Sequence, residues 1–450
     1  MAWHIGVRDR IATLTLDAQA LDEEAAYLLA DAARRTAADP SAKGVIVCID
    51  APVFSAPQAD ALEQVQVRAD ALRAATRTLE TCGKPVVAAI SASALDGGFA
   101  IALACHLRLA ADELALRLGF PAVRAGLMPG NGVTQRLPRL IGADRALPLL
   151  LEGRTLAPEA ALKARIVDRI VPILELHKAA ADWIRASSAR EATQPWDAKG
   201  FVYPGPDPRT HAGAGAWAVA NAMQRKASYG NYPALDAIMG AVYDAWVTPM
   251  DVALRIEGKY LRRLLRDPRT AAMFGNAVAA RTRREAPPPG YSEALHTAYA
   301  AEGVHLLEEG TPPALIENAG RMAGFNDGPL ATADMIGLAA FERVQVARDL
   351  VREGRKGAAS GRGFYAYRNG ERTGLWPGLR DRRVSNNHPP ADQTRCRLLS
   401  ATASAAEPLL ANGSISDEQA ADVFGVAAGF PAWTGGPISW MRTLAERARD

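Results

Sequence analysis

Hydrophobic and polar positions alternate with two different periods in the first 190 residues. Short apolar runs, typical of buried strands, occur at Ile11–Leu16, Gly44–Ile49 and Pro85–Ile90. Between them, Glu23–Ala38 and Val67–Cys82 repeat their apolar residues with the 3.6-residue period of amphipathic helices. Strands that alternate with helices predict an α/β region with a largely parallel sheet.

The pattern changes after this region. Residues 191–230 are rich in Pro and Gly and predict an irregular connector. Helical periodicity returns over Ala234–Trp246 and Asp251–Leu265, and from Tyr291 onward the pattern predicts helices only. We therefore expect three segments: 1–190, 191–285 and 286–450.

The last segment repeats itself weakly. Leu306–Gly310 (LLEEG) has an echo in Leu409–Gly413 (LLANG). Gly324-Phe325 before Gly328-Pro329 is echoed by Gly429-Phe430 before Gly436-Pro437. Three short matches in the same order predict two related helical halves.

Composition and charge exclude several classes of protein. A chain of 450 residues with a net charge of +3 has no excess of positive charge for gripping nucleic acid. No apolar run approaches the ~18–20 residues that span a bilayer, and the start MAWHIGVRDRIATL does not read as a signal peptide. The four cysteines lie far apart without a C-x-x-C pair, so neither a disulfide framework nor a zinc site is expected. We expect a reduced, cytoplasmic protein with no membrane span and no nucleic-acid partner.

Residues 84–142 are the richest stretch in chemistry. A buried strand runs through a turn of small residues into a helix that begins at Gly97-Gly98. Backbone N–H groups at a helix N-terminus lack helical partners, and glycine lets a ligand carbonyl approach them closely. The turn therefore predicts a donor to an oxyanion such as a thioester enolate. A tight packing turn would explain the same residues without a ligand.

This stretch resembles the crotonase (enoyl-CoA hydratase/isomerase) superfamily. The resemblance lies in Ile90–Ala100, in Met128–Pro138 (MPGNGVTQRLP) and in Phe54-Ser55-Ala56. It implies an α/β crotonase-type ββα superhelix domain that takes an acyl-CoA thioester. It also implies an oxyanion hole made by the backbone N–H groups of Ala56 and Gly97.

The remainder resembles parts of one larger enzyme family, the multifunctional fatty-acid-oxidation α-subunits. Asn231–Arg281 looks like their linker helices, and residues 291–450 are similar to the all-α C-terminal domain of 3-hydroxyacyl-CoA dehydrogenase. The matching pieces of that domain are Leu306–Gly310, Asp334–Leu338 and Gly361–Tyr367. The resemblance implies an oligomer and a thiolase-like or other acyl-CoA-processing partner subunit.

Two departures from the family bear on function. The family's hydratase reaction uses two glutamates, and their positions hold Ala100 and Ala122. A methyl group transfers no proton, so ordinary hydratase activity is expected to be absent or very weak.

The second departure is a missing dinucleotide-binding domain. Its place between Arg284 and Pro287 is too short for a strand, a Gly-rich turn and a helix. The one G-x-G-x-x-A match, Gly213–Ala218, follows a Pro-rich stretch rather than a strand. We therefore expect no NAD, no other cofactor and no metal, and no 3-hydroxyacyl-CoA dehydrogenase activity.

Asp96 is the candidate replacement for the lost acid/base groups. It stands directly before Gly97, where the family usually has a glycine, and its carboxylate would be a displaced base. Asp is also a good N-cap for the helix that begins at Gly97, which is the alternative role. His106 is interpreted as a core or surface histidine rather than a catalytic one. Glu257 could reach a substrate, but the nearby Lys259 and Arg262 favour a salt-bridged helix face.

Three hypotheses for function remain open. The first is a non-hydratase lyase or isomerase that acts on an acyl-CoA thioester and stabilises an enolate in the Ala56/Gly97 hole, with Asp96 or water as the base. The second is a catalytically inactive pseudoenzyme that binds acyl-CoA or serves as a subunit of an acyl-CoA-processing complex. The third is a scaffold that binds no CoA.

Overall fold

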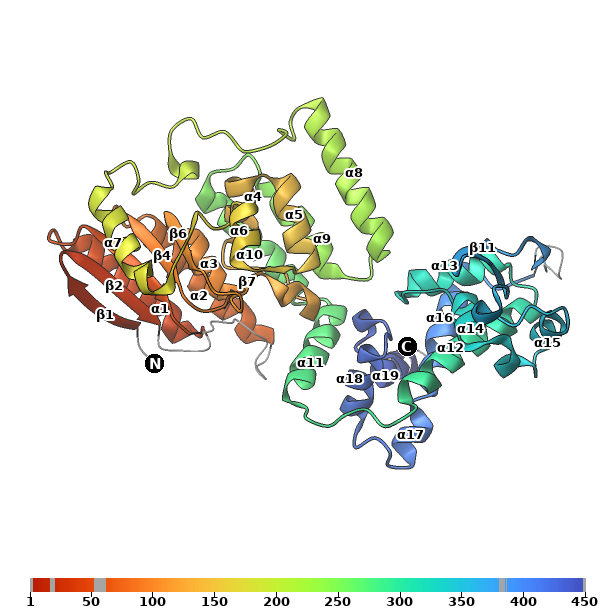
Figure 1. Cartoon of the computed structure of the whole chain (residues 1–450). Coiled ribbons are helices and arrows are strands. Elements are labelled where there is room, and N and C mark those ends of the chain that lie inside the picture. Colours follow the sequence, from red (N-terminus) through yellow and green to blue (C-terminus); the bar gives the residue numbers. More distant parts are fainter. Residues whose placement is uncertain (1–2, 17–20, 52–61, 380–384, 386, 448–450) are drawn as a thin grey trace. The chain divides into compact units, whose positions relative to one another are not determined.

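The computed structural model describes residues 3–16, 21–51, 62–379, 385 and 387–447 (Figure 1). The chain divides into two compact units. The first comprises Met1–Gln224 with Pro233–Ala271, and the second comprises Arg225–Tyr232 with Ala272–Asp450. Each unit is described by itself.

The first unit contains a six-stranded, mostly parallel sheet. Its strands, in spatial order, are β1 (Trp3–Arg8), β2 (Ile11–Leu16), β3 (Gly44–Ile49), β4 (Val86–Ile90), β6 (Leu107–Ala111) and β9 (Arg169–Val171). Only β1 is antiparallel to its neighbour. The three strands predicted from the sequence are confirmed. β3 and β4 are continuous apolar runs buried inside the parallel part of the sheet, whereas β2 alternates buried apolar residues with the half-buried Thr13 and Thr15.

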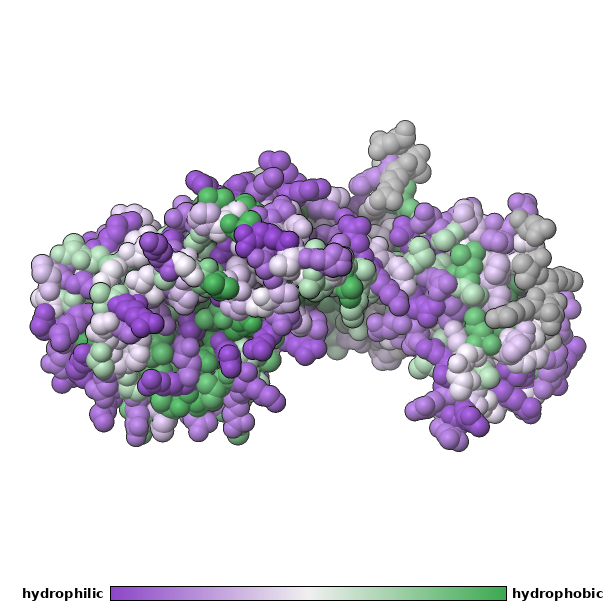
Figure 2. Space-filling view, turned by 90° about the horizontal axis from the view of Figure 1, so that it is seen from above, coloured by the Kyte–Doolittle hydropathy of each residue, from purple (hydrophilic) through white to green (hydrophobic). Residues whose placement is uncertain are grey.

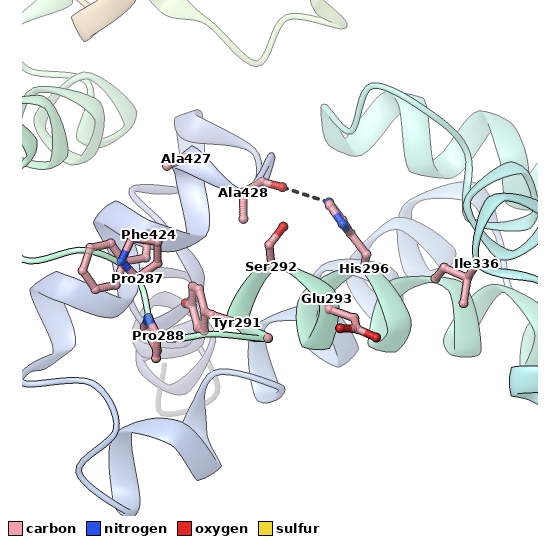
Figure 3. A pocket seen from close by; sticks show the side chains of 11 residues that line it. Pro287, Pro288, Tyr291, Ser292, Glu293, His296, Ile336, Phe424, Ala427 and Ala428 are labelled. Carbon is pink, nitrogen blue, oxygen red and sulfur yellow. Dashed lines mark hydrogen bonds between the residues drawn. The ribbon is translucent and has the colours of Figure 1, made fainter.

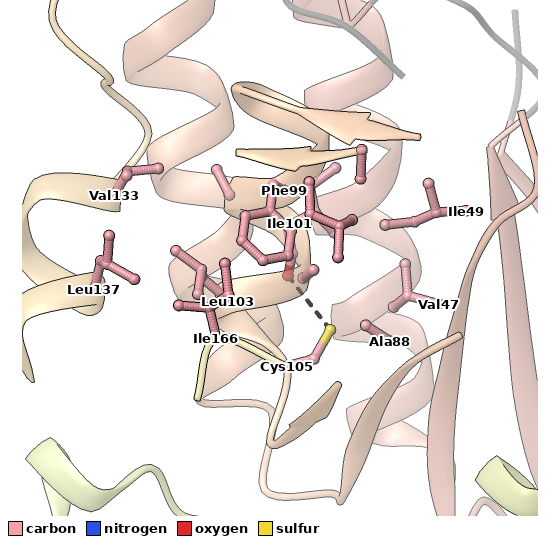
Figure 4. Packing of buried hydrophobic residues seen from close by; sticks show 14 of the residues in the cluster. Val47, Ile49, Ala88, Phe99, Ile101, Leu103, Cys105, Val133, Leu137 and Ile166 are labelled. Carbon is pink, nitrogen blue, oxygen red and sulfur yellow. Dashed lines mark hydrogen bonds between the residues drawn. The ribbon is translucent and has the colours of Figure 1, made fainter. Parts of the chain in front are cut away.

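Helices and a second small sheet surround this sheet. The helices are α1 (Glu23–Ala38), α2 (Leu62–Glu80), α3 (Gly97–Ala104), α4 (Val133–Ile141), α5 (Ala143–Glu152), α6 (Pro158–Lys163) and α7 (Leu176–Ala186). The small sheet joins β5 (Ala94–Leu95), β7 (Leu118–Gly119) and β8 (Thr155–Leu156). Every residue of α3 is buried, and Figure 4 shows its apolar side chains packed among those of the neighbouring strands and helices.

Four further helices follow: α8 (His211–Ser228), α9 (Pro233–Ala245), α10 (Met250–Leu264) and α11 (Pro268–Thr282). The predictions for α9 and α10 are confirmed to within a residue. The prediction of an irregular connector is wrong for α8. The turn residues end before Thr210, whose hydroxyl accepts the Gly213 N–H at 3.1 Å and so caps an alanine-rich helix. The G-x-G-x-x-A match therefore lies inside a helix, not at a strand-to-helix turn.

The second unit is mainly helical. Its longer helices are α12 (Tyr291–Glu308), α13 (Pro313–Ala323), α14 (Pro329–Ile336), α15 (Gln345–Arg352), α16 (Ala391–Ser404), α17 (Glu407–Ala411), α18 (Glu418–Ala427) and α19 (Pro437–Arg447). The expectation of helices alone misses one hairpin, β10 (Tyr365–Arg368) and β11 (Glu371–Leu375). Asn369-Gly370, both at positive φ, form its turn, and this dipeptide is the sequence signal that was overlooked.

The C-terminal ends of α13 and α18 are built alike. The Gly324 N–H donates to Arg321 O at 3.0 Å, and the Gly429 N–H donates to Val426 O at the same distance. The phenylalanines that follow these glycines, Phe325 and Phe430, meet edge to face with ring centroids 5.8 Å apart. We propose from this shared pattern that the two helical halves are related.

All four cysteines are free thiols. Burial raises the pKa of Cys48 to about 11 and also raises the pKa values of Cys82 and Cys105. Within the described ranges, no helix is both long and apolar enough to cross a bilayer. Nor do the described His, Cys, Asp and Glu side chains gather in a group of three or more that would hold a metal ion.

Candidate active site

The turn between β5 and α3 places Asp96 in an unusual backbone conformation. Its N–H donates to Gly119 O of β7 at 2.9 Å, which ties the turn to the small sheet. Its φ is 47° and its ψ is −109°, a region that glycine adopts readily and other residues rarely. Such a backbone costs on the order of 1–3 kcal/mol and is found most often at functional sites.

The Asp96 side chain points at the segment that carries Ala122. Its Oδ1 accepts the Ala122 backbone N–H at 3.1 Å, and the residue is only 8% exposed. The carboxylate makes no capping hydrogen bond to α3, so the alternative prediction of an N-cap is wrong. Asp22 and Asp417, whose side chains do cap helices, have a negative φ. Asp96 has a positive φ, and its side chain bonds to Ala122 instead of to the first turn of α3.

Burial sets the acidity of this carboxyl group. Desolvation raises the pKa of Asp96 from 3.8 to about 7, although the Ala122 N–H acts in the opposite direction. A carboxyl group with a pKa near 7 populates both protonation states at neutral pH. That property is what a general acid or base requires.

Asp96 is bonded to both positions where the family's glutamates would stand. Its carbonyl oxygen accepts the Ala100 N–H at 2.9 Å, and its carboxylate accepts the Ala122 N–H. Ala100 is fully buried in α3, and Ala122 is half-buried in the 3-10 helix Pro121–Ala125. Asp96 is therefore tied through its backbone to Ala100 and through its carboxylate to the backbone of Ala122.

The oxyanion hole remains a prediction. Gly97 is the first residue of α3 and is buried. Ala56 lies outside the described residues.

The Met128–Pro138 motif is held in place by Glu257 of α10. Glu257 accepts the N–H groups of Gly132 at 2.6 Å and Thr134 at 3.1 Å, and the Thr134 hydroxyl at 2.5 Å. It is fully buried and bonds to this motif, so its interpretation as part of a helix face salt-bridged to Lys259 and Arg262 is wrong. A signal existed in the motif itself, because a helix that starts after Gly132 has no capping side chain of its own and needs an acceptor from elsewhere.

A buried ion pair anchors the same motif. The Arg136 Nε and Nη2 atoms donate to the two carboxylate oxygens of Glu80 at 3.1 and 3.0 Å. Trp196 donates to the same carboxylate at 3.0 Å, and Arg136 also donates to Asn131 O. With their hydrogen bonds satisfied within the protein, these charged groups serve the structure rather than a ligand.

His106 also has a structural role, as predicted. Its Nδ1 accepts the Val86 N–H at 3.0 Å. Burial and the nearby Arg108 lower its pKa to about 4, so the imidazole stays neutral at physiological pH.

The second unit has a pocket of about 560 Å³. Figure 3 shows Pro287, Pro288, Tyr291 and Phe424 on one side and His296, which bonds to Ala428 O at 2.9 Å, on the other. None of the residues predicted for the active site lines it.

The mixed sheet, the small second sheet and the buried helix after a small-residue turn define a crotonase-type α/β domain, followed by a mainly helical region. Residues 7–194 match the family model of enoyl-CoA hydratase/isomerase. Residues 291–367 match that of the 3-hydroxyacyl-CoA dehydrogenase C-terminal domain. The chain thus carries a crotonase-type α/β domain similar to enoyl-CoA hydratases/isomerases, followed by a helical region that includes a match to the 3-hydroxyacyl-CoA dehydrogenase C-terminal domain.

The relatives extend this assignment. The fatty acid oxidation complex subunit alpha of Aliivibrio fischeri is 36% identical over 190 residues, which are 42% of this chain and 26% of that protein. The chain thus spans about a quarter of the length of that curated relative.

Solved structures of enoyl-CoA hydratases also match. The enzyme from Bacillus halodurans is 21% identical with a TM-score of 0.45, over 61% of this chain and 99% of that one. A protein described as an enoyl-CoA hydratase from Geobacillus kaustophilus is 26% identical with a TM-score of 0.38, over 60% of this chain and 90% of that one.

Proposed function

We propose that the first unit binds an acyl-CoA thioester and catalyses a lyase- or isomerase-type reaction through an enolate, with Asp96 as the proton-transferring group. The observation that carries the proposal is the Asp96 carboxylate, which is buried, has a pKa near 7 and is bonded to the Ala122 backbone. Its strained backbone adds support, because residues held at such angles are found most often at functional sites.

The proposed step is a proton transfer. The ionised Asp96 takes the α-proton of the acyl group, the electron pair of the C–H bond becomes the enolate, and an O–H bond forms on Asp96. The Ala56 and Gly97 N–H groups would hold the enolate oxygen. Return of the same proton to another carbon isomerises the substrate without an added cofactor.

Hydration does not fit this arrangement. Activation of water and delivery of the α-proton are the tasks of two carboxylates, and Ala100 and Ala122 supply neither. The same two alanines favour the alternative proposal, a pseudoenzyme that binds acyl-CoA or serves as a subunit beside an acyl-CoA-processing partner. The apolar patch on the face of the first unit in Figure 2 suits either proposal, since both need a place for an acyl chain.

The test is exchange of the α-protons of acyl-CoA thioesters in D₂O, followed by mass spectrometry. We expect exchange by the full chain, and a loss of about 10²–10⁴-fold in Asp96→Asn, which keeps the acceptor for Ala122 but cannot take a proton. The exchange rate should rise with pH and level off above about pH 7, since Asp96 must be ionised.

Calorimetry with the same thioesters separates the alternatives. Binding without exchange would leave the pseudoenzyme and remove the catalytic proposal. Absence of binding would remove both. Hydration of crotonyl-CoA at an ordinary enzymatic rate would contradict the argument from the two alanines.

A further inference from the structure

The chain contains three Asn-Gly pairs, at residues 131–132, 369–370 and 412–413. In this dipeptide the asparagine side-chain amide is open to attack by the next backbone nitrogen, because glycine has no side chain to shield that nitrogen. The attack is intramolecular, so its rate depends on whether the glycine N–H is free and on whether the segment can move. The three pairs differ in both respects.

The pair at Asn131 is protected twice. Asn131 is only 8% exposed, and the Gly132 N–H donates to the Glu257 carboxylate at 2.6 Å. The nitrogen is therefore engaged by a buried acceptor, and it becomes available only when the surrounding structure opens.

The pair at Asn412 is exposed but constrained. The Gly413 N–H donates to Leu410 O at 3.1 Å, and the Asn412 Oδ1 accepts the Ser414 N–H at 2.9 Å. The nitrogen must leave its hydrogen bond, and the amide must turn away from Ser414, before the two groups can meet. We expect this pair to react at an intermediate rate.

The pair at Asn369 has neither form of protection. Asn369 and Gly370 form the exposed two-residue turn between β10 and β11, with φ values of 53° and 81°. Among the described residues, none accepts the Gly370 N–H or bonds to the Asn369 side chain. Exposed tips of this kind are among the parts of a fold that open most readily.

We propose that Asn369 is a site of covalent modification for which the chain itself supplies the nucleophile. The Gly370 nitrogen attacks the Asn369 Cγ, and the new C–N bond closes a succinimide ring. The side-chain nitrogen leaves as ammonia and takes the proton of the Gly370 N–H. Water then opens the ring at either carbonyl, which leaves an aspartate or an isoaspartate. The reaction is independent of acyl-CoA turnover and of Asp96.

The two products differ in their effect on the hairpin. Aspartate tolerates the left-handed conformation of Asn369, whereas isoaspartate adds a methylene group to the backbone of the turn. A longer turn changes how β10 and β11 pair. The hydroxyls of Tyr365 and Tyr367 in β10 donate to Glu317 at 2.5 Å and to Asp334 at 3.1 Å, respectively. The isoaspartate form should therefore satisfy these buried carboxylates less well.

Incubation of the full chain in H₂¹⁸O at mildly alkaline pH, followed by peptide mass spectrometry, tests the proposal. Ring opening adds an ¹⁸O atom and so marks modification that occurs during the incubation. We expect labelling at Asn369 to be about 5-fold or more faster than at Asn412, since a hydrogen bond must first break at Gly413. No label is expected at Asn131 while the chain stays folded.

The chain unfolded in urea is the control for the effect of structure, because all three pairs should then label at rates within about 3-fold of one another. Asn369→Gln, whose longer side chain closes the ring much more slowly, should remove the label from that peptide and leave labelling at Asn412 unchanged. The aged chain should also unfold at a lower temperature than Asn369→Asp, and equal unfolding temperatures would remove the assigned effect on the hairpin.

Labelling at Asn412 or Asn131 that keeps pace with Asn369 in the folded chain would overturn the proposal. So would the absence of label at Asn369 over a period in which the unfolded chain becomes fully labelled.

Discussion

The buried carboxylates at the starts of three helices differ from the buried carboxylate of Asp96 in the number of hydrogen bonds that they accept. Glu257 in the first unit, and Glu317 and Asp422 in the second, each accept several hydrogen bonds at the start of a helix. Asp96, which directly precedes α3, is comparably buried, but among the described residues its carboxylate accepts only the Ala122 backbone N–H. Carboxylates whose lone pairs are filled by the protein stabilise it, whereas the proposed role of Asp96 depends on lone pairs that the described residues leave unfilled.

The second unit applies the stabilising arrangement twice. Glu317 accepts the Leu330 N–H at 2.7 Å, just after Gly328-Pro329, and Asp422 accepts the Ile438 N–H at 2.7 Å, just after Gly436-Pro437. Burial raises the pKa of both groups while these hydrogen bonds lower it. This shared arrangement, a buried carboxylate that accepts the first helical N–H after a Gly-Pro pair, supports the proposed relation between the two halves.

The largest expected effect is the loss of Glu257. Glu257→Ala leaves the Gly132 and Thr134 donors buried without an acceptor, so it should destabilise the first unit by about 3 kcal/mol. Urea unfolding measures this, with Arg255→Ala on the exposed face of the same helix as the control. Similar stabilities for the two variants would contradict the assigned role of Glu257.

The second prediction concerns pH and Asp96. Because its pKa is raised on folding, the native state keeps a proton between about pH 4 and pH 7 that the unfolded chain releases, so this group's contribution to stability falls across that window and is constant above it. Asp96→Asn removes the effect and should be more stable than the unaltered chain by on the order of 2 kcal/mol at pH 8.

The difference in stability between the unaltered protein and Asp96→Asn should become small near and below pH 4, where the Asp96 carboxyl group is protonated in the folded protein and increasingly also in the unfolded chain. A stability difference that does not change between pH 4 and pH 8 would mean that Asp96 is well solvated.

The third prediction isolates the backbone of Asp96. Asp96→Gly and Asp96→Ala both lose the carboxylate and the acceptor for the Ala122 N–H, but only glycine relieves the positive φ, so Asp96→Gly should be about 1 kcal/mol more stable than Asp96→Ala at the same pH. Thermal unfolding of the two variants at pH 8 provides the comparison. A less stable glycine variant would show that the turn is not strained.

The smallest effect is expected at the edge of the Glu317 site. Tyr365 donates its hydroxyl to Glu317 at 2.5 Å, so Tyr365→Phe should cost about 1 kcal/mol and raise the pKa of Glu317 further. Tyr243→Phe, at an exposed ring of α9, is the control. Unfolding as a function of pH should show a larger loss of stability at high pH for Tyr365→Phe alone.

Much of the fold follows from the sequence. The strands at Ile11, Gly44 and Val86 and the helix at Glu23 begin within a residue of their predicted starts, because local periodicity determines them. The small sheet was not predicted, because β5, β7 and β8 have two residues each and are defined by distant pairing. The helix α8 was missed since its Gly and Ala residues show no apolar face.

The site was less predictable for a related reason. The sequence singled out Asp96 and the alanines at positions 100 and 122 as candidates, but not the direction of the Asp96 side chain, which depends on a backbone angle. Glu257 was misread because its partner, the turn at Gly132, lies far away in the sequence and the burial of Glu257 depends on tertiary packing.

The positions of the cysteine thiols make it possible to measure how often the first unit opens locally. Cys48, Cys82 and Cys105 lie in the first unit and Cys396 in the second. Buried thiols of raised pKa react with an alkylating reagent only when the structure around them opens. The rate of alkylation at Cys48 and at Cys105, resolved by peptide mass spectrometry, would therefore report the rate of local opening around each of these residues in the unaltered chain.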